Sequence, residues 1–468
     1  MDTVTTILTG FMGVLSGWLV LLLLYQLAIS FFGYKKNTKD YKDYPPQMRF
    51  LILVPAHNEE MVIGDIIQNL NEMEYPRELY DFYILADNCT DQTVAVAQGL
   101  GAKVLESRKE SPDAPTGKPI VLQKGLKTLE GYQQNYDLVM FFDADNLVDK
   151  NMLSEVNSQY LDSDRKADII QCYLGSKNRK GVVALFYYMT YTITNRFFQY
   201  AKSRLKLNSV IGGTGFAVSA EYLYRRGGWT AMSLTEDFEL QIEATCEGKR
   251  ILWNNNVRIY DEKPTGFQAS FRQRCRWAQG HWFVAFKNTK KLFHALFQGR
   301  IRFGEFFSTF LYMYSLTPYV ILTLQLILGM MMQSFQWLGW IEQAPAAASA
   351  QSWLTLNWPG ILLFFYSFIF LFYVGDRMDN HNRFDFKSFF PMLLSVLLNT
   401  VLAGVAQVVG LLRHRKQTNW VKTEHKINHN QDMVVHLIED EGEDQEQAQQ
   451  RLNRSSKPEV QTEESVGV

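Results

Sequence analysis

Two aspartates one residue apart, Asp143 and Asp145, directly follow a run of apolar residues at 138–142. Such a run is typical of a buried strand. In an open α/β sheet, ligands bind at the carboxyl ends of the strands, where these two carboxylates would lie. Residues i and i+2 of an extended chain point to the same side, so the pair could hold a hard divalent cation and, through it, a diphosphate. By itself the spacing is a weak signal, because aspartates commonly occupy turns and caps.

Further polar residues stand at the ends of other apolar runs. Asp87 follows the run at 82–86, and Lys118 precedes Pro119 at the start of a helical pattern. Taken singly, Asp87 is most simply a helix-entry turn residue, and Lys118 a solvated surface lysine. A site for a sugar nucleotide needs such groups together: a carboxylate near the base or ribose, a cation near the diphosphate, and a pair that holds a metal ion.

Short apolar runs that alternate with helical patterns supply the elements that would position these groups. The runs lie at 50–54, 82–86, 103–105 and 138–142. Strands alternating with helices predict a mostly parallel sheet. We therefore expect one α/β domain over residues 49–265, with its polar strand ends converging on one edge.

A series of motifs in a fixed order points to the same kind of site. The motifs are V-P-A-H-N-E-E at 54–60, D-N-C-T-D at 87–91, G-K-P at 117–119, D-A-D at 143–145, G-G-T-G at 212–215, T-E-D at 235–237 and Q-R-C-R-W at 273–277. In this order they resemble the motifs of family 2 glycosyltransferases. The last resembles the Q-x-x-R-W signature of the membrane-embedded branch, which includes cellulose, hyaluronan and poly-N-acetylglucosamine synthases. The resemblance covers about residues 50–300 and the flanking membrane segments.

The resemblance implies a fold and a reaction. The fold would be of the GT-A type, an α/β domain with a Rossmann-like, mostly parallel sheet, joined to α-helical transmembrane segments. The reaction would be inverting transfer of a hexose from a nucleotide diphosphate sugar, expected to be a UDP-sugar. The residues that would bind this donor are Asp87, Lys118, Asp143, Gln273 and Arg276. Asp143 and Asp145 would hold Mg²⁺ or Mn²⁺, which stabilises charge on the leaving diphosphate.

The acceptor hydroxyl must lose a proton, and the resemblance assigns the role of base to Asp237. Asp237 stands two residues after Thr235 at the start of a helical pattern, so a capping box is the competing explanation. Both can hold, because the start of a helix is a rigid place to mount a base. A raised pKa would make the carboxylate an efficient base near neutral pH.

The resemblance also assigns Glu236, Gly213, Gly215 and Trp277 to the acceptor. The two glycines would let the backbone approach the acceptor closely, or they form a tight turn before a strand at 216–218. Trp277 would stack on the acceptor sugar, or it anchors the chain at the membrane interface as aromatic residues often do. We favour the acceptor role for Trp277.

Composition excludes some classes of function. The formal net charge is −1 over 468 residues, so there is no electrostatic case for a nucleic-acid partner. The 4 cysteines show no C-x-x-C spacing, which argues against a zinc site and for reduced thiols in the cytosol.

The N-terminal segment predicts a membrane helix. Residues 3–34 contain no charged residue, which is long enough to cross a bilayer, since a crossing takes about 20 residues. Lysines and an arginine follow between Lys35 and Arg49, so the positive-inside rule places the following domain in the cytosol. A cleaved signal peptide fits poorly, because no basic region precedes the apolar run.

Three further apolar segments lie at 306–332, 358–374 and 389–412. If all three crossed, Arg413 and the basic residues after it would lie outside, against the positive-inside rule. One assignment must therefore be wrong, and Pro318 and Pro391 mark the segments that could be broken. A stretch at 420–423 resembles the tryptophan-bearing gating loop of some synthases, which favours a cytosolic tail.

The expected organisation is a transmembrane helix at 1–34, a cytosolic catalytic domain at 35–265, interfacial helices at 266–305, transmembrane helices at 306–412 and a polar, disordered tail at 413–468. We predict a multi-pass cell-membrane enzyme that elongates a β-linked exopolysaccharide processively and exports it. The alternative is a single addition to a membrane lipid. A transporter whose domain only senses nucleotide is disfavoured, because its membrane segments hold almost no charge. The sequence does not indicate the sugar, the linkage or an accessory subunit.

Overall fold

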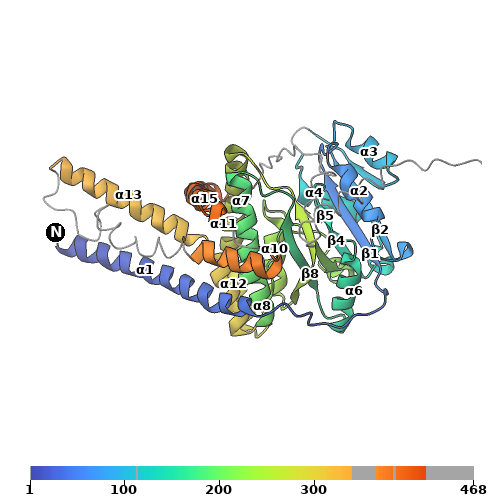
Figure 1. Cartoon of the computed structure of the whole chain (residues 1–468), viewed down its shortest axis with the longest axis horizontal. Coiled ribbons are helices and arrows are strands. Elements are labelled where there is room, and N and C mark those ends of the chain that lie inside the picture. The colour runs from blue at the N-terminus through green and yellow to red at the C-terminus, as the bar shows by residue number, and fades with distance from the viewer. Residues whose placement is uncertain (1, 112–113, 340–364, 366, 383–385, 418–468) are drawn as a thin grey trace, which may run out of the picture.

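The computed structural model describes residues 2–111, 114–339, 365, 367–382 and 386–417 (Figure 1). An α/β domain forms one end of the molecule. Two long helices, α1 (Asp2–Ser30) and α13 (Thr317–Trp337), extend from it toward the other end, and further helices lie between them and the domain. The chain therefore separates into a sheet-based part and a helical part.

In the described part of the chain, eight strands form one sheet in the order β3-β2-β1-β4-β7-β6-β8-β5. The strands are β1 (Phe50–Ala56), β2 (Tyr80–Asp87), β3 (Lys103–Ser107), β4 (Leu138–Phe141), β5 (Leu147–Val148), β6 (Ile169–Ser176), β7 (Phe216–Ser219) and β8 (Ile251–Asp261). β1 pairs in parallel with β2 and β4, β2 with β3, and β6 with β8. β7 is antiparallel to both of its neighbours, and β5 is antiparallel to β8. The predicted mostly parallel sheet is confirmed, with all the expected strands in it.

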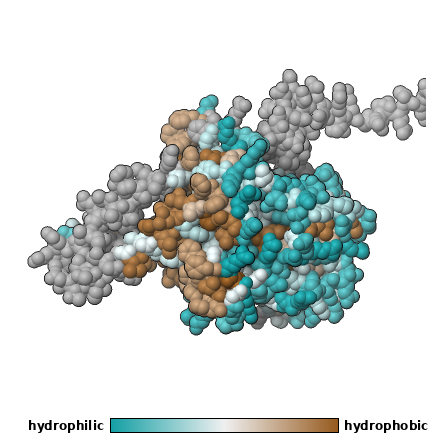
Figure 2. Space-filling view, turned by 90° about the horizontal axis from the view of Figure 1, so that it is seen from below, coloured by the Kyte–Doolittle hydropathy of each residue, from teal (hydrophilic) through white to brown (hydrophobic). Residues whose placement is uncertain are grey.

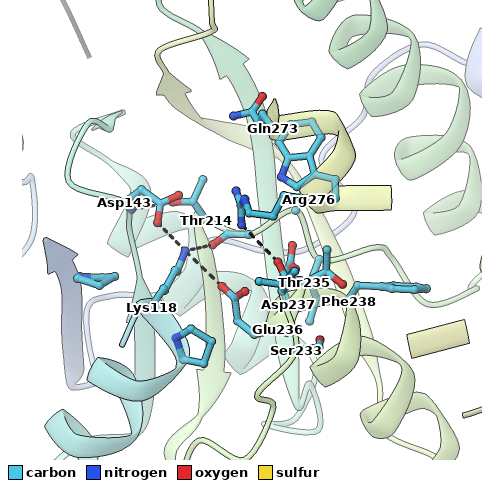
Figure 3. A pocket seen from close by; sticks show the side chains of 18 of the residues that line it. Lys118, Asp143, Thr214, Ser233, Thr235, Glu236, Asp237, Phe238, Gln273 and Arg276 are labelled. Atoms are coloured by element: carbon cyan, nitrogen blue, oxygen red, sulfur yellow. Dashed lines mark hydrogen bonds and ion pairs between the residues drawn. The ribbon is translucent and has the colours of Figure 1, made fainter. Parts of the chain in front are cut away.

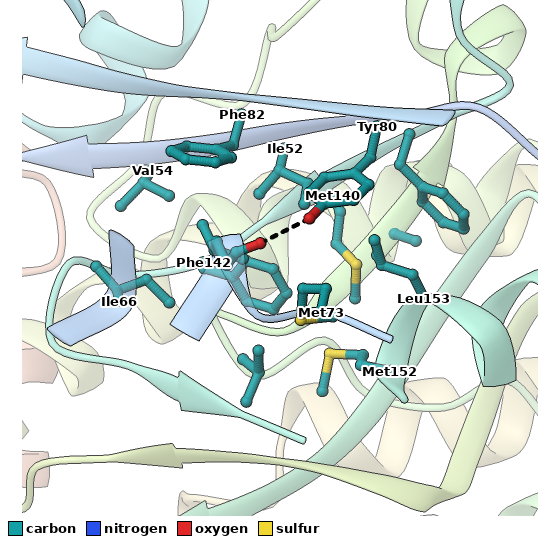
Figure 4. Close-up of a cluster of buried hydrophobic side chains, with 14 of the residues drawn as sticks. Ile52, Val54, Ile66, Met73, Tyr80, Phe82, Met140, Phe142, Met152 and Leu153 are labelled. Atoms are coloured by element: carbon teal, nitrogen blue, oxygen red, sulfur yellow. Dashed lines mark hydrogen bonds between the residues drawn. The ribbon is translucent and has the colours of Figure 1, made fainter. Parts of the chain in front are cut away.

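Helices cover both faces of this sheet. They are α2 (Ile63–Asn71), α3 (Thr93–Gly99), α4 (Lys118–Thr128), α5 (Tyr132–Asn135), α6 (Met152–Asp162), α9 (Ala220–Arg225) and α10 (Glu236–Cys246). Side chains of β1 alternate between the two faces, as in any strand. Ile52 and Val54 pack with α2 and α6 in the cluster of Figure 4, whereas Leu51 and Leu53 pack with α4 and α10 on the other face. The central strands are thus buried on both sides, which holds their carboxyl ends in fixed positions.

The helical part is joined to the sheet at several places. Its other elements are η1 (Phe31–Tyr34), α7 (Val182–Thr194), the π-helix η3 (Asn195–Tyr200), α8 (Ala201–Arg204), α11 (Phe267–Phe297), α12 (Phe303–Met313) and α15 (Phe386–Arg413). Arg196 of η3 forms a 2.8 Å ion pair with Asp379, and both side chains are fully buried. The same guanidinium donates to the Gly33 carbonyl at 2.6 Å. This pair joins the end of α1, the π-helix and the helical residues 367–379.

Two described helices, Gly13–Tyr34 and Phe386–Arg413, are long and apolar enough to cross a membrane. The segment predicted at 306–332 is broken: α12 and the first part of α13 meet at a bend of 46°. Pro318 lies in the first turn of α13, just after the bend, whereas Pro391 lies inside α15 without interrupting it. Residues 358–364 of the remaining predicted segment lie outside the described residues, and so does the stretch at 420–423.

Helix α15 runs across the direction of α1 and α13, and Figure 1 shows it close to end-on. Along its length, α15 contacts elements that are attached to the sheet. The Ser395 hydroxyl donates to the Val182 carbonyl of α7 at 2.6 Å, and the amide oxygen of Gln417, just past its end, accepts from the Leu234 N–H at 2.9 Å. Its outer face is apolar, with exposed side chains at Phe386, Phe390, Leu394, Leu397, Leu398, Val401, Val405 and Leu412. Figure 2 shows apolar side chains gathered in a band beside the hydrophilic α/β domain.

Candidate active site

One cavity of about 970 Å³ lies at the carboxyl ends of β1, β2, β4 and β8. Its opposite wall comes from the start of α10 and from α11, α12 and α15. All the predicted site residues except Gly215 line this cavity. The strand ends therefore converge as the sequence pattern indicated.

Lys118, in the first turn of α4, reaches to the middle of the cavity (Figure 3). Its ammonium group donates to the Gly213 carbonyl at 2.6 Å and forms a 2.5 Å ion pair with Asp143. One carboxylate oxygen of Glu236 lies 3.9 Å from it. Burial disfavours its charge, but the carboxylates of Asp143 and Glu236 outweigh burial and raise the pKa of Lys118. Lys118 thus stays charged at neutral pH between residues from three different motifs.

Asp143 and Asp145 lie in a turn after β4 rather than in extended chain, so the i, i+2 argument for their common direction was wrong. The turn is closed by the Asn146 N–H, which donates to the Asp143 carbonyl at 3.1 Å. The Asp143 side chain is 38% exposed, whereas Asp145 is buried and accepts from the Glu262 N–H at 3.1 Å. Both residues still line the same cavity. Two carboxylates on one wall suit a hard divalent cation, with a diphosphate and water as further ligands.

Asp87 shapes the loop that carries Lys118. Its carboxylate accepts from the Gly117 N–H at 2.9 Å and from the side-chain amide of Asn88 at 2.6 Å. Gly117 has φ +109°, in the region that favours glycine. Asp87 therefore has a structural role in this loop, in addition to the nucleotide contact predicted for it.

Glu236 and Asp237 form the first turn of α10, at the edge of the cavity (Figure 3). Burial raises the pKa of Glu236 to about 7, with Asp237 adding to the rise and Lys118 opposing it. Burial also raises the pKa of Asp237. Thr235 occupies the N-cap position, but its side chain makes no capping hydrogen bond, so the competing capping-box explanation does not hold. The two carboxyl groups are thus mounted on a helix start and titrate closer to neutrality than free carboxyl groups.

The two predicted glycines play different parts. A Cβ on Gly213 would lie 3.3 Å from a carboxylate oxygen of Asp237, so this backbone does approach the predicted base closely. A Cβ on Gly215 would lie 1.8 Å from the Ile259 side chain, because Gly215 packs into the domain away from the cavity. The structure gives Gly215 a packing role in place of the expected acceptor contact.

The Q-x-x-R-W residues project into the cavity from α11, as Gln273 and Arg276 do in Figure 3. The Gln273 amide oxygen accepts from the Tyr187 hydroxyl at 2.9 Å, and Trp277 meets the Tyr187 ring edge-on at 6.1 Å. Arg276 donates to the Leu234 carbonyl at 3.3 Å. Trp277 thus lines the cavity, and its acceptor role stays a prediction.

The loop before α10 is held by a side chain of α10 itself and by side chains of more distant segments. Glu239 accepts from the N–H groups of Met232 and Ser233, at 2.9 and 2.8 Å. Leu234 is held on both sides, its N–H by Gln417 and its carbonyl by Arg276. These hydrogen bonds tie the turn that precedes Asp237 to α11 and to the segment just after α15.

Sequence reasoning missed several residues of this cavity. Asp261 ends β8 beside the predicted metal pair; burial and the nearby carboxylates of Asp145 and Asp143 raise its pKa, although Lys263 opposes them from 2.5 Å. Its position at a strand end was a usable signal. Gln407 and Gln417 also line the cavity, and no motif marks them, since both stand at least 130 residues after Trp277, the last residue of the recognised motifs.

Comparison with known proteins identifies the family of this chain. A family model described as "Glycosyltransferase like family 2" matches residues 45–280. A probable glycosyltransferase of Bacillus subtilis, YdaM, is 25% identical over 264 residues, which cover 56% of this chain and 61% of that protein. A β-monoglucosyldiacylglycerol synthase of Nostoc sp. is 28% identical over 246 residues, 51% of each chain. The chain spans about half to three fifths of the length of the curated relatives it matches.

A solved structure shares the fold. The mannosyltransferase PcManGT from Pyrobaculum calidifontis, solved with GDP-Man and Mn²⁺, superposes with a TM-score of 0.54 at 16% identity. The superposition covers 85% of this chain and 98% of that chain, so it includes helices outside the sheet domain.

Proposed function

This chain belongs to the glycosyltransferases of the family 2 type, and on that premise we propose that it moves a hexose from a nucleotide diphosphate sugar, expected to be a UDP-sugar, to a hydroxyl of a glycan acceptor at the membrane. One observation carries the proposal. A buried carboxyl pair, Glu236 and Asp237, shares a single cavity with Lys118 and with the aspartates after β4. Such a cavity can meet the two needs of sugar transfer, which are a stabilised leaving group and a base for the acceptor.

The strand-end side of the cavity would hold the donor. Lys118 can place its charge against the diphosphate, and Arg276 can offer a planar fork to phosphate oxygens. Asp87 would contact the nucleotide while it holds the loop of Lys118. Asp143 and Asp145 would hold Mg²⁺ or Mn²⁺, which supplies positive charge where the diphosphate leaves.

Asp237 would act as the base. It takes the proton of the acceptor hydroxyl as the hydroxyl oxygen attacks the anomeric carbon. The bond from that carbon to the diphosphate oxygen breaks, and the nucleoside diphosphate leaves with the electron pair. One direct displacement inverts the anomeric centre, so an α-linked donor would give a β-linked product.

The residues that line the helical side of the cavity support a glycan as the acceptor. Rings offer flat apolar faces to sugars, and amides hydrogen-bond to hydroxyl groups, whereas acyl chains need neither. The residues of this lining that carry rings or amides are Gln273, Trp277, His281, Tyr312, Gln407 and Gln417. A ring that binds by apolar contact lets the product slide, which suits processive elongation of an exopolysaccharide. Leu316, at the bend before α13, also lines the cavity, which supports export along the helices.

A single addition to a membrane lipid is the second candidate. It is favoured by the 28% identity to synthases named for β-monoglucosyldiacylglycerol, and by the exposed apolar face of α15, which could lie against lipid. Such an enzyme would need only an opening at the bilayer surface.

We also propose a membrane arrangement. The α/β domain faces the cytosol, α1 and α13 cross the cell membrane, and the apolar segment predicted at 358–374 crosses back to the cytosol. Helix α15 then lies along the cytosolic surface with its apolar face toward lipid. Arg413, Arg415 and Lys416 then stay in the cytosol, which removes the conflict with the positive-inside rule. A cysteine introduced at Gly101 or at Lys416 should escape an impermeant thiol reagent in intact cells, and labelling at either position would contradict this arrangement.

The activity itself is tested with membranes that contain the protein, incubated with a panel of radiolabelled UDP-sugars. We expect one of them to enter a β-linked product. If none is consumed faster than with Asp237→Asn membranes, the proposal is wrong.

A further inference from the structure

Helix α15 carries polar side chains on the face that it packs against the rest of the protein, and one of them is unlike the others. Ser395 donates to the Val182 carbonyl at 2.6 Å. The Asn399 amide donates to the Ser395 carbonyl at 2.9 Å and accepts from Arg274 at 3.3 Å. Gln407 lies two turns further on, and its amide oxygen has no hydrogen-bond partner among the described residues.

The missing hydrogen bond carries a free-energy cost, because Gln407 is buried. The side chain is 9% exposed, and its amide oxygen is shielded from solvent. A buried polar group loses its water and must be compensated by another hydrogen bond. Ser395 and Asn399, on the same face of the helix, receive this compensation from the protein. Gln407 differs from them in one respect, because it lines the cavity that holds Asp237.

The packing of α15 on α11 fixes Gln407 near the acceptor side of that cavity. Gly410, one turn after Gln407, lies so close to α11 that an added Cβ would be 2.4 Å from the Ala278 Cβ. Ala278 directly follows Trp277, the residue proposed to stack on the acceptor. The contact between Gly410 and Ala278 therefore brings Gln407 and Trp277 to the same part of the cavity.

We propose that Gln407 binds the acceptor, its amide forming a hydrogen bond with a hydroxyl of the sugar ring that contacts Trp277. The inference rests on the proposed function and deepens it, since it assigns part of the acceptor site to a helix outside the family-matched residues 45–280. A sugar hydroxyl is available both at the end of a growing glycan and on a glycolipid headgroup, and the product distinguishes these two sources.

The test compares Gln407→Met with Asn399→Ala in the full-length protein reconstituted in lipid vesicles. Methionine keeps the length of glutamine and removes the hydrogen bonds. The donor is the UDP-sugar that supports turnover of the wild type. Three quantities are measured: transfer as a function of added acceptor, which is the wild type's own product, hydrolysis of the donor without acceptor, and thermal stability.

We expect Gln407→Met to raise the half-saturating acceptor concentration about two- to tenfold, the range that corresponds to the net contribution of one hydrogen bond. Donor hydrolysis should stay within about twofold, and thermal stability should stay the same or rise, because an unpaired buried amide is gone. Asn399→Ala should do the opposite: it lowers thermal stability and leaves the half-saturating concentration unchanged.

Two results would overturn the inference. The first is an unchanged half-saturating concentration in Gln407→Met, which would mean that only water satisfies the amide. The second is an equal loss of transfer and of donor hydrolysis, which would mean a structural role. Neither result touches the proposed function, which fails separately if the wild type consumes no UDP-sugar. Extraction of the product into organic solvent identifies a glycolipid source, and retention in water identifies a glycan.

Discussion

The two sides of the cavity are built in different ways. The proposed donor side, with Asp87, Lys118, Asp143 and Asp145, stands on the ends of strands that are buried on both faces. The proposed acceptor side is formed largely by α11 and α15, which meet through contacts such as Gly410 on Ala278 and Arg274 on Asn399. A sheet core holds the first side, and helix–helix contacts hold the second. Changes on the two sides should therefore separate donor chemistry from acceptor binding.

Loss of the metal should have the largest effect, because the donor side cannot neutralise the diphosphate without it. We expect excess EDTA to abolish transfer and added Mg²⁺ or Mn²⁺ to restore it. Asp145→Asn should likewise abolish transfer while the protein keeps its elution volume in detergent. Asp164→Asn changes an exposed surface aspartate and should have no effect. Full activity in excess EDTA would show that transfer does not require a metal ion.

Asp237→Asn should have the next largest effect. Asparagine is nearly isosteric but accepts no proton, so turnover should fall by about 10²–10⁴, the usual share of general base catalysis. Donor binding, measured by titration with the nucleotide sugar, should stay within a few-fold. Glu221→Gln, on the surface of α9, serves as the control. A parallel loss of binding would mean that Asp237 holds the donor or the metal, and the base would have to be sought elsewhere.

The fold was largely predictable from the sequence, and so were most residues of the candidate site, whereas the contribution of α15 to the cavity was not. The apolar runs at 50–54 and 138–142 have the length and composition of buried strands, and both are strands of the sheet. The polar residues at their ends converge because parallel strands end at one edge. The turn geometry of Asp143 and Asp145 escaped prediction, since a strand's end cannot be located to one residue.

The position of α15 beside the cavity depends on tertiary packing that leaves no local pattern. Helix α15 has the composition of a crossing helix, and its direction comes from contacts with α7 and α11 that are distant in sequence. Gln407 is one polar residue in an apolar run, and only the structure brings it to the cavity.

The pH dependence of turnover should report the buried carboxyl pair. Burial raises the pKa of Glu236 to about 7 and also raises that of Asp237. A base acts only in its deprotonated form, so the raised pKa of Asp237 means that activity is lost, roughly tenfold per pH unit, at a higher pH than an ordinary aspartate would give. We expect this loss of activity at low pH in the turnover rate at saturating donor concentration, and not in the affinity for the donor. An inflection near the ordinary aspartate pKa of about 4 would show that the pair is not perturbed during catalysis.

The smallest effect is expected from the contact between the helices. Gly410→Ala places a Cβ against the backbone and side chain of Ala278, so α15 must shift, at about 1–3 kcal/mol. Transfer to the acceptor should fall several-fold, with donor hydrolysis unchanged. Gly404→Ala is the matched control on the same helix, because its Cβ would come no closer than 3.8 Å to another residue. Equal loss of hydrolysis and transfer in Gly410→Ala would mean that the two sides are not separable.

The size of the product distinguishes processive elongation from a single addition. Purified full-length protein is incubated with one labelled UDP-sugar, and the product is sized after extraction of lipids. We expect a polymer of many units, and we expect Trp277→Ala to shorten it more than it reduces hydrolysis of the donor. A single sugar on an extractable lipid, unchanged in size at high donor concentration, would contradict this expectation.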